Sequence, residues 1–512
     1  MVLRRSMRTT ATALVVAIAA SVGLVSVAPA ASAGTTETFR VNSTLDSFDR
    51  VCDEADCSLR DAIAQAGPRD RVQVPSGFYT LTRTGAGGVG RGDIDLRASI
   101  EIAGVGHTGV FIDASTLGER AFTLGSATVG KRYLLRGITI FGARDPSIDG
   151  AAIAIEGGEG TLSDVTIVGS QGSDGGAVWT GPDTAVQIVR SLLLGNEASG
   201  DGGAIHADGD LVVNTSTLAG NRATNGGGVH ASGRFASFDS STIAENVATG
   251  DGGGAWLATG AAISFTTIAD NAAAGRGGGV RRPANAAHEV AVGRSIISGN
   301  DATRSIDCAG RIVSTGGNAG LAKGCGLHLP SDRAGIDPDL RGLGPYGGPT
   351  PTMALRPGSR AIGAAGACRI TDQRGAPRDG RCDAGAYELV RCLGRPVNIV
   401  GTRGDDELSG GRGRDVFIGL GGNDEFQGSI GKDRACGGPG DDLLIAGPGN
   451  DRFDGEGGND RIRGETGDDW IWGGPGRDRL VGGPGDDQCQ AERGDRRPRG
   501  CEILVTVVAG RR

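Results

Sequence analysis

The chain has 512 residues, of which 94 are glycine and only 4% are aromatic, and its formal net charge is −8. So few aromatic side chains in so long a chain argue against one large globular core, and the lack of a basic excess argues against a nucleic-acid partner. The composition favours an elongated protein built from narrow repeated units.

Residues 1–33 have the three parts of a secretory signal peptide. Arg4, Arg5 and Arg8 precede an apolar run over 11–27, which ends at Ala31-Ser32-Ala33. This order predicts cleavage after Ala33 and a secreted, extracellular mature chain. The apolar run is too short for a confident membrane span, so we expect no transmembrane segment in the mature chain.

Ten cysteines suit an oxidising compartment and predict disulfides. Neighbouring cysteines suggest the pairs Cys52–Cys57, Cys308–Cys325 and Cys368–Cys382. Sequence order leaves the partners of the other four open: Cys392, Cys436, Cys489 and Cys501. Because there is no C-x-x-C pair, zinc is not expected.

Residues 34–69 predict an N-terminal cap. Ser58 is a candidate helix N-cap with Asp61 three residues later, and Leu59, Ala62, Ile63 and Ala66 would form one apolar face. The stretch Cys57-Ser58-Leu59-Arg60-Asp61-Ala62 resembles the N-terminal motif of CSLREA-domain proteins, with Asp where that family has Glu. The resemblance implies a bacterial surface or secreted protein with a β-helical body, whose open end the short helix would cover.

Residues 70–333 contain a repeat of about 25 residues. A Gly-Gly-apolar signature recurs at 175–178, 202–205, 226–229, 252–255 and 277–280, and Asn recurs at 196, 221, 246 and 271. Residues one period apart stack when each repeat is one coil, so each Asn could take a left-handed turn and hydrogen-bond its copy in the next coil. Twenty-five residues are too few for a propeller blade. The pattern resembles the right-handed parallel β-helix of pectate-lyase-like and polymorphic-outer-membrane-like proteins.

One column of this repeat could contact a ligand. The position after each Gly-Gly signature should face outward, and it is occupied by Ala154, Trp179, His206, His230, Trp256 and Arg281. Flat aromatic faces stack on sugar rings, so Trp179, His206, His230 and Trp256 are candidate contacts for an extracellular polysaccharide or cell-surface glycan. The alternative is a ladder that only shields glycine-rich coils.

Two other patterns resemble a cofactor-binding motif and a catalytic site, but their surroundings in the sequence argue against both functions. Residues 104–109 match G-x-G-x-x-G, yet a strand rather than the helix of a dinucleotide site is expected next. The stacked Asp174, Asp201 and Asp251, with Asn225 between them, could approximate glycosidase carboxylates, but their place before Gly-Gly indicates turn residues. We therefore predict no catalytic residue and no organic cofactor.

Residues 334–400 predict the last β-helix coils, a disulfide-stapled cap and a hinge. The stretches 347–350, 354–359, 371–375 and 385–388 resemble the C-terminal end of many CSLREA and choice-of-anchor-type β-helical proteins, with Met353 where that family has His. The resemblance implies that the β-helix ends here.

Residues 401–490 form ten consecutive nonapeptides without an insertion, and residues 491–512 form a C-terminal tail. The first position is Gly in all repeats but one (Ala446), the fourth is always Gly and the eighth is apolar or small. The sixth is always Asp: Asp406, Asp415, Asp424, Asp433, Asp442, Asp451, Asp460, Asp469, Asp478 and Asp487. Glycine permits the positive-φ turns that aim carbonyls at one point, and Asp adds a hard oxygen ligand suited to Ca²⁺.

This block resembles the hemolysin-type calcium-binding repeats of RTX proteins. The resemblance implies a parallel β-roll with two nonapeptides per turn, several Ca²⁺ ions, and one ion at most for each of the eight pairs of next-but-one repeats. A flexible Gly/Asp linker is the alternative, which the strict register disfavours. Nineteen acidic residues against ten basic ones give this block a charge of about −9, which cations would offset.

The sequence thus predicts an all-β double solenoid, a right-handed parallel β-helix followed by a calcium-binding parallel β-roll. Its expected function is that of a secreted interaction or adhesion protein with calcium and glycan partners. The alternative is an extracellular polysaccharide lyase or glycoside hydrolase acting in the β-helix groove. Because β-helices serve both purposes, the fold alone leaves enzymatic activity open.

Overall fold

A computed structural model of the chain describes residues 36–501 except 86–88, 91, 105–108, 126–129, 287, 369–370, 379 and 493, together with the strand at 503–506. The expected signal peptide, residues 1–33, lies outside the described residues. No helix in the described part of the chain is long and apolar enough to cross a membrane.

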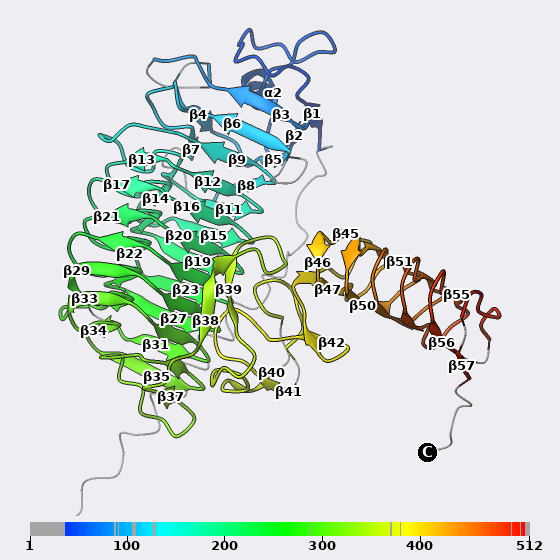
Figure 1. Ribbon diagram of the computed structural model, residues 1–512. Coiled ribbons are helices and arrows are strands. Elements are labelled where there is room, and N and C mark those ends of the chain that lie inside the picture. Colours follow the sequence, from blue (N-terminus) through cyan, green and yellow to red (C-terminus); the bar gives the residue numbers. More distant parts are fainter. Residues whose placement is uncertain are drawn as a thin grey trace, which may run out of the picture. The chain divides into compact units, whose positions relative to one another are not determined.

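The one α-helix of the described residues, α2 (Leu59–Gln65), has Ser58 as its N-cap, as predicted. The Ser58 Oγ accepts a hydrogen bond from the Asp61 backbone N–H at 3.1 Å and donates one to Asp61 Oδ2 at 2.7 Å. Leu59, Ala62 and Ile63 are buried in the same core as the first coils of the β-helix, beside which α2 lies in Figure 1. The capping residue and the apolar face of this helix are confirmed.

The residues up to 334 form a right-handed parallel β-helix made of four sheets, in which each coil adds one strand to a sheet (Figure 1). Sheet 1 contains β1 (Thr38–Arg40), β2 (Arg71–Val74), β5 (Glu101–Gly104), β8 (Arg132–Arg136), β11 (Glu159–Ser163), β15 (Ala185–Val189), β19 (Asp210–Asn214), β23 (Phe235–Asp239), β27 (Gly260–Ser264), β31 (Val290–Gly293) and β35 (Ile312–Gly316). Sheet 2 contains β3 (Gly77–Thr80), β6 (Val110–Asp113), β9 (Thr139–Phe141), β12 (Thr166–Val168), β16 (Leu192–Leu194), β20 (Thr217–Ala219), β24 (Thr242–Ala244), β28 (Thr267–Ala269), β32 (Ile296–Ser298), β36 (Ala319–Gly320) and β37 (Arg333–Ala334).

The other two sheets consist of shorter strands. Sheet 3 contains β4 (Ile94–Leu96), β7 (Phe122–Leu124), β10 (Ile153–Ile155), β14 (Val178–Thr180), β18 (Ile205–Ala207), β22 (Val229–Ala231), β26 (Ala255–Leu257), β30 (Val280–Arg281) and β34 (Cys308–Ala309). Sheet 4 contains β13 (Gln171–Gly172), β17 (Glu197–Ala198), β21 (Arg222–Ala223), β25 (Val247–Ala248), β29 (Ala272–Arg276) and β33 (Asp301–Arg304). Leu193 pairs with Leu218, and Ile243 with Ile268, which confirms the 25-residue coil.

A ladder of asparagines runs through the buried turn between sheets 2 and 4. The Nδ2 of each Asn donates to the Oδ1 of the next, at 3.0 Å from Asn196 to Asn221, 2.8 Å from Asn221 to Asn246 and 2.9 Å from Asn246 to Asn271. The predicted hydrogen bonds are confirmed. The predicted left-handed conformation belongs instead to the residue before each Asn (Gly195, Gly220, Glu245 and Asp270), because that residue makes the bend that points the amide inward.

Residues 334–389 do not continue the parallel coils, contrary to expectation. They form antiparallel pairs, β38 (Leu340–Gly344) with β39 (Thr352–Leu355) and β40 (Gly366–Cys368) with β41 (Gly380–Cys382). This segment packs against sheet 2, where the Gln373 amide donates to Thr217 Oγ1 at 2.7 Å and accepts from Thr242 Oγ1 at 2.6 Å. Outward-facing threonines of sheet 2 supply these partners, so the segment covers the side of the solenoid.

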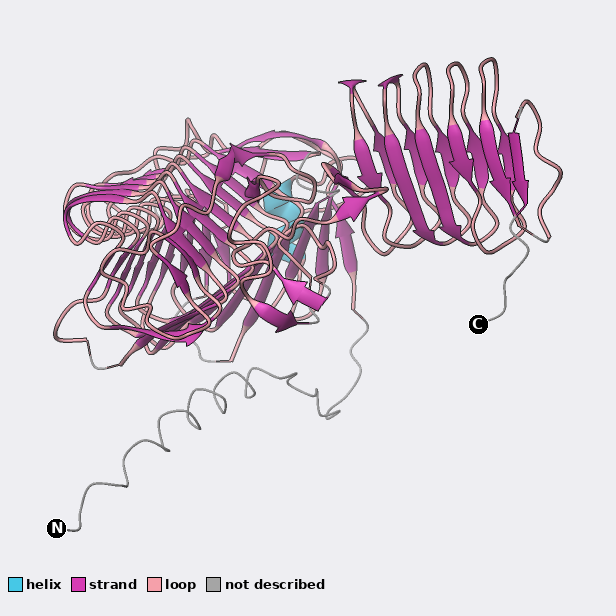
Figure 2. Ribbon diagram, turned by 60° about the horizontal axis from the view of Figure 1, so that its bottom comes forward, coloured by secondary structure: helices cyan, strands magenta, loops and turns pink. Residues whose placement is uncertain are grey.

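The nonapeptide block forms a second parallel solenoid, which follows the hairpin of β42 (Arg391–Cys392) and β43 (Arg395–Pro396) (Figure 2). One sheet contains β44 (Ile399–Val400), β47 (Val416–Ile418), β50 (Arg434–Pro439), β52 (Arg452–Gly457), β54 (Trp470–Trp472), β56 (Gln488–Ala491) and β57 (Ile503–Thr506). The other contains β45 (Glu407–Ser409), β48 (Glu425–Gln427), β51 (Leu443–Ile445), β53 (Arg461–Arg463) and β55 (Arg479–Val481), and β46 (Arg412–Gly413) pairs with β49 (Ile430–Gly431). Phe426 pairs with Leu444, so one turn takes 18 residues, or two nonapeptides.

All ten cysteines are paired. The three predicted disulfides are present, and the four cysteines left open pair as Cys392–Cys436 and Cys489–Cys501. These last two disulfides tie β50 of the β-roll to the preceding hairpin, and β56 to the segment before β57. Five cross-links in one chain fit an oxidising compartment.

Candidate metal centre

The aspartates of the β-roll form two buried ladders, one along each row of turns. One carboxylate oxygen, Oδ1, accepts the backbone N–H of the Asp two repeats earlier. Eight such hydrogen bonds, of 2.7–2.9 Å, join the ten aspartates. The next-but-one pairing of repeats that the sequence predicts therefore exists between the aspartates themselves.

The second carboxylate oxygen, Oδ2, forms no such hydrogen bond in most of these residues. Oδ2 is buried without a hydrogen-bond partner in seven of these residues, Asp424, Asp433, Asp442, Asp451, Asp460, Asp469 and Asp478, each of which is at most 2% exposed. A buried oxygen anion without a donor is costly. A cation is one group that would remove this cost.

The glycine at the first position of a repeat has no side chain, so the space in front of this oxygen stays open. A Cβ added to Gly437 would lie 2.3 Å from Asp442 Oδ2 and 2.7 Å from the Gly455 carbonyl oxygen. Gly419 stands in the same relation to Asp424 Oδ2, at 2.2 Å. In these repeats a carboxylate oxygen and a backbone carbonyl of the next-but-one repeat thus converge on a point that the missing side chain of the glycine leaves open.

This geometry corrects the role that the sequence suggested for the first glycine. None of the first glycines has a positive φ; the left-handed residues are those at the second position, such as Leu420, Ser429 and Glu456, and several glycines at the fourth. The first position is glycine because a side chain would fill the space between the two oxygens.

Burial also raises the pKa of these carboxyl groups well above the ordinary Asp value. The pKa is raised to about 6 for Asp424, Asp433, Asp442, Asp469 and Asp478, to about 7 for Asp451 and to about 8 for Asp460. Neighbouring carboxylates add to this effect of burial, and the backbone N–H bonds oppose it. The charged form is therefore disfavoured until a positive charge joins it.

The residues present fit a hard divalent cation. No group of three or more His, Cys, Asp or Glu side chains able to hold a metal occurs among the residues that the structure describes, so a cation here would draw most of its ligands from backbone carbonyls. Carboxylate and carbonyl oxygens in a flexible cage are the donors that Ca²⁺ prefers. The first repeats differ, because Asp406 Oδ2 already accepts from Thr402 Oγ1 at 3.0 Å and Asp415 Oδ2 accepts from the Gly411 N–H at 2.9 Å.

The aromatic column of the β-helix is in register, as expected, but its two histidines are covered. The ring centroids of His206 and His230 lie 4.6 Å apart, and those of His230 and Trp256 lie 4.1 Å apart with nearly parallel planes. His206 and His230 are buried because rings of neighbouring coils cover them, whereas Trp179 and Trp256 are half-buried. His230 Nε2 also lies 3.4 Å from Asp201 Oδ2. A ligand on this face would meet mainly the two tryptophans.

The stacked acids before Gly-Gly are engaged in turns. Asp174 Oδ1 accepts the Asp201 backbone N–H at 2.6 Å, Asp201 Oδ1 accepts that of Asn225 at 3.0 Å, and Asn225 Oδ1 accepts that of Asp251 at 2.9 Å. These side chains satisfy the backbone of the next coil, which is the role that their place in the sequence predicts.

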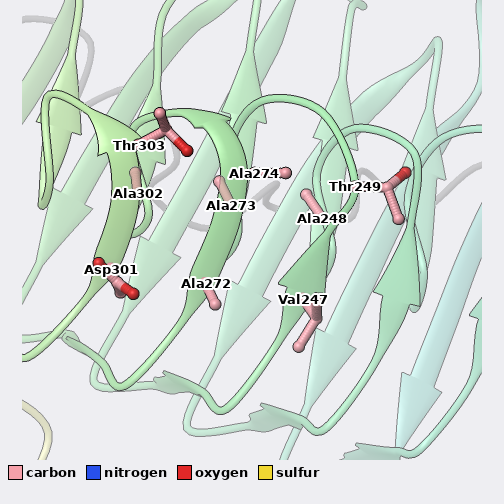
Figure 3. Close-up of a pocket in the computed structure, with 9 residues that line it drawn as sticks. All are labelled: Val247, Ala248, Thr249, Ala272, Ala273, Ala274, Asp301, Ala302 and Thr303. Carbon is pink, nitrogen blue, oxygen red and sulfur yellow. The ribbon is translucent and has the colours of Figure 1, made fainter.

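A groove of about 470 Å³ follows sheet 4 (Figure 3). Its walls are mostly alanines from β25, β29 and β33, and Asp301 is its only charged residue. Such a strip of small side chains is what narrow stacked coils require, and it brings no reactive groups together.

One protein-family model matches the β-roll. Residues 398–426, 427–462 and 454–489 match the family model of the RTX calcium-binding nonapeptide repeat, so the β-roll consists of calcium-binding repeats. The sequence matches no curated protein.

Three solved structures share low sequence identity with this chain. A pectate lyase, Pel9A, is 14% identical with a TM-score of 0.43, over 69% of this chain and 97% of that one. The catalytic domain of a GH87 alpha-1,3-glucanase is 11% identical with a TM-score of 0.24, over 94% and 67%. A PL6 family alginate lyase, AlyGC, is 8% identical with a TM-score of 0.24, over 89% and 81%.

Proposed function

We propose that this chain is an extracellular interaction protein whose β-roll folds around Ca²⁺ and whose β-helix presents a recognition surface. The observation that carries the proposal is the row of buried Asp Oδ2 atoms without hydrogen-bond partners, five of which (Asp424, Asp433, Asp442, Asp460 and Asp469) face a backbone carbonyl across a glycine. The sixth-position aspartates, Asp406 to Asp487, would be the side-chain ligands. Bound Ca²⁺ would supply the positive charge that this row lacks.

Export from the cytoplasm accounts for two features of the chain. The charged, apolar and A-x-A segments of residues 1–33 support a cleaved leader. Five disulfides support an oxidising destination. Millimolar extracellular calcium is sufficient for sites of moderate affinity.

A calcium titration of the full-length protein, followed by circular dichroism, tests the calcium role. We expect the β signal to rise as Ca²⁺ replaces chelator, because carboxylate repulsion and glycine entropy oppose folding of the β-roll until ions bind. Mg²⁺ should substitute poorly, since it resists dehydration into a carbonyl cage. Identical spectra throughout the titration would contradict the proposal.

A glycan is the partner that the aromatic column favours. Trp179 and Trp256 are half-buried and lie outside the hydrophobic core, while the flanking residues of the same strands are buried. Each sugar–aromatic contact contributes about 1 kcal/mol, by analogy with aromatic stacking, so binding should be weak and lost in steps.

A glycan array tests this contact with a matched control. Trp179→Ala with Trp256→Ala should abolish glycan retention, while Trp470→Ala with Trp472→Ala, which removes two half-buried tryptophans of the β-roll, should preserve it. A blank array for the native protein, or equal retention by both double variants, would leave the column a purely structural ladder.

A further inference from the structure

Coil length varies along the β-helix: the first coils are longest, the middle ones keep about 25 residues, and one later coil is longer again. Strand pairing keeps a shift of 25 residues at Ala255–Val280, but the shift is 29 at Ala261–Val290. The four extra residues therefore lie between β30 and β31, in the loop 282–289. Insertions in a solenoid often mark its binding face.

The inserted loop is held by a buried arginine. Arg282 is 9% exposed, and its Nε donates to the His288 carbonyl at 2.8 Å while its Nη2 donates to the Ala286 carbonyl at 2.6 Å. Its hydrogen bonds go to neutral backbone, and no carboxylate of the described residues is within ion-pair distance of it. The loop therefore keeps a buried positive charge that no acid neutralises.

This arginine lines a pocket of about 570 Å³ together with four others, Arg276, Arg281, Arg304 and Arg311, and with Ser305. No acidic residue is among the lining residues of the pocket. Arg281 pairs with Asp251 at 3.0 Å and Arg311 with Glu289 at 2.9 Å. Five positive charges thus face two acidic partners, in a chain whose formal net charge is −8.

The remaining two arginines are direct neighbours. Arg276 on β29 and Arg304 on β33 are register partners, both are exposed, and neither side chain forms an ion pair with an acid of the described residues. Only the Arg276 backbone N–H meets a carboxylate, donating to Asp251 Oδ1 at 2.8 Å. Like charges opposite each other on adjacent strands repel. An anion between them would turn this repulsion into attraction, since guanidinium groups bind carboxylate and sulfate oxygens in pairs.

We infer that this arginine pocket binds the anionic groups, carboxylate or sulfate, of an acidic polysaccharide. The aromatic column favours a glycan over another polyanion, because Arg281 is the register partner of Trp256 and so continues that column into the pocket. A chain of sugars could place a ring on Trp256 and an acidic substituent among the arginines. The inference rests on the proposed recognition role of the β-helix and names the chemical class of its ligand.

Binding of the full-length, calcium-loaded protein to immobilised alginate and to chondroitin sulfate tests the inference and separates carboxylate from sulfate. We expect retention by at least one of them, weakened by salt because the contacts are partly exposed. Arg276→Gln with Arg304→Gln should lower affinity at least about tenfold, since both charge-assisted contacts are lost. The control Arg132→Gln with Arg234→Gln removes the same charge from exposed sites elsewhere on the β-helix and should bind like the native protein.

Three outcomes would overturn the inference. If neither polysaccharide retains the protein, while calcium-dependent folding and neutral-glycan binding are both observed, the arginine pocket does not bind acidic polysaccharide. The proposed function is not affected by that result. Equal weakening by the test and control variants shows a general charge effect. Equal or tighter binding to single-stranded DNA shows a surface for any polyanion. If the native protein folds equally well with and without Ca²⁺, the proposed function is rejected instead.

Discussion

The two solenoids of this molecule bury their polar turns in opposite ways. In the β-helix the Asn246 amide donates to Asn271 and accepts from Asn221, so both ends of its side chain are satisfied by adjacent coils. In the β-roll Asp442 accepts one N–H on Oδ1, while its Oδ2 has no partner. The first ladder is complete within the chain, and the second leaves an oxygen that a cation would satisfy.

The difference follows from charge. A neutral amide that is fully hydrogen-bonded can be buried at little cost, whereas burial of a carboxylate favours its protonated form. The pKa of Asp460, raised to about 8, shows the size of that effect near the middle of the β-roll. We therefore expect the β-helix to fold without ions and the β-roll to depend on them.

Hydrogen exchange measured by mass spectrometry should show the largest contrast. With chelator, the amides of β48 and β51 should exchange at nearly unprotected rates, because the β-roll unfolds, while β20 and β24 stay protected. Added Ca²⁺ should restore protection of the β-roll alone. Protected β48 and β51 amides in chelator would contradict the comparison.

Breaking the asparagine ladder should destabilise the β-helix whether or not calcium is present. Asn246→Ala leaves the buried polar groups of Asn221 and Asn271 without their partner, which costs about 3 kcal/mol. Denaturant unfolding should show the same loss in Ca²⁺ and in chelator. Gln187→Ala, which changes an exposed side chain of β15, serves as the control and should change stability little.

Acidification should weaken the β-helix through His230. Burial, with a smaller contribution from His206, lowers its pKa from 6.5 to about 3. The unfolded imidazole binds a proton near pH 6.5 and the folded one only near pH 3. Stability is therefore lost as the pH falls through this range, by about 2 kcal/mol at pH 5.

A variant isolates this histidine. His230→Phe keeps a ring against Trp256 but cannot titrate, so its stability between pH 6.5 and 5 should vary less than that of the native protein. Parallel pH profiles of the two proteins in saturating Ca²⁺ would contradict the assignment.

Substitutions in the β-roll should have graded effects on calcium affinity. Asp442→Asn with Asp460→Asn keeps the Oδ1 hydrogen bonds but removes two Oδ2 ligands, and should lower affinity about tenfold or more. Asp406→Asn should have a smaller effect, because its Oδ2 already accepts from Thr402. Calorimetric titration compares them; equal losses would show that position along the β-roll does not matter.

Much of this fold could be predicted because it is periodic. A strict repeat means that each residue meets its own copy one period away, so the 25-residue coil and the Asn196–Asn271 ladder follow from the spacing. The spacing of the β-roll gives nonapeptides, and the resemblance to RTX repeats implied two of them per turn. The helix N-cap at Ser58 and the three short-range disulfides were predictable because each joins residues that are close together in the sequence.

Contacts between segments far apart in the sequence were decided by the tertiary structure. Gln373 meets Thr217 and Thr242 across more than 130 residues, and Cys392 pairs with Cys436 past several strands. The burial of His206 and His230 depends on the rings above and below them, and the arginine pocket includes Arg282 and Ala284 of an inserted loop. A repeat in the sequence determines what lies one coil away, but only packing determines what covers a surface and where an insertion places its side chains.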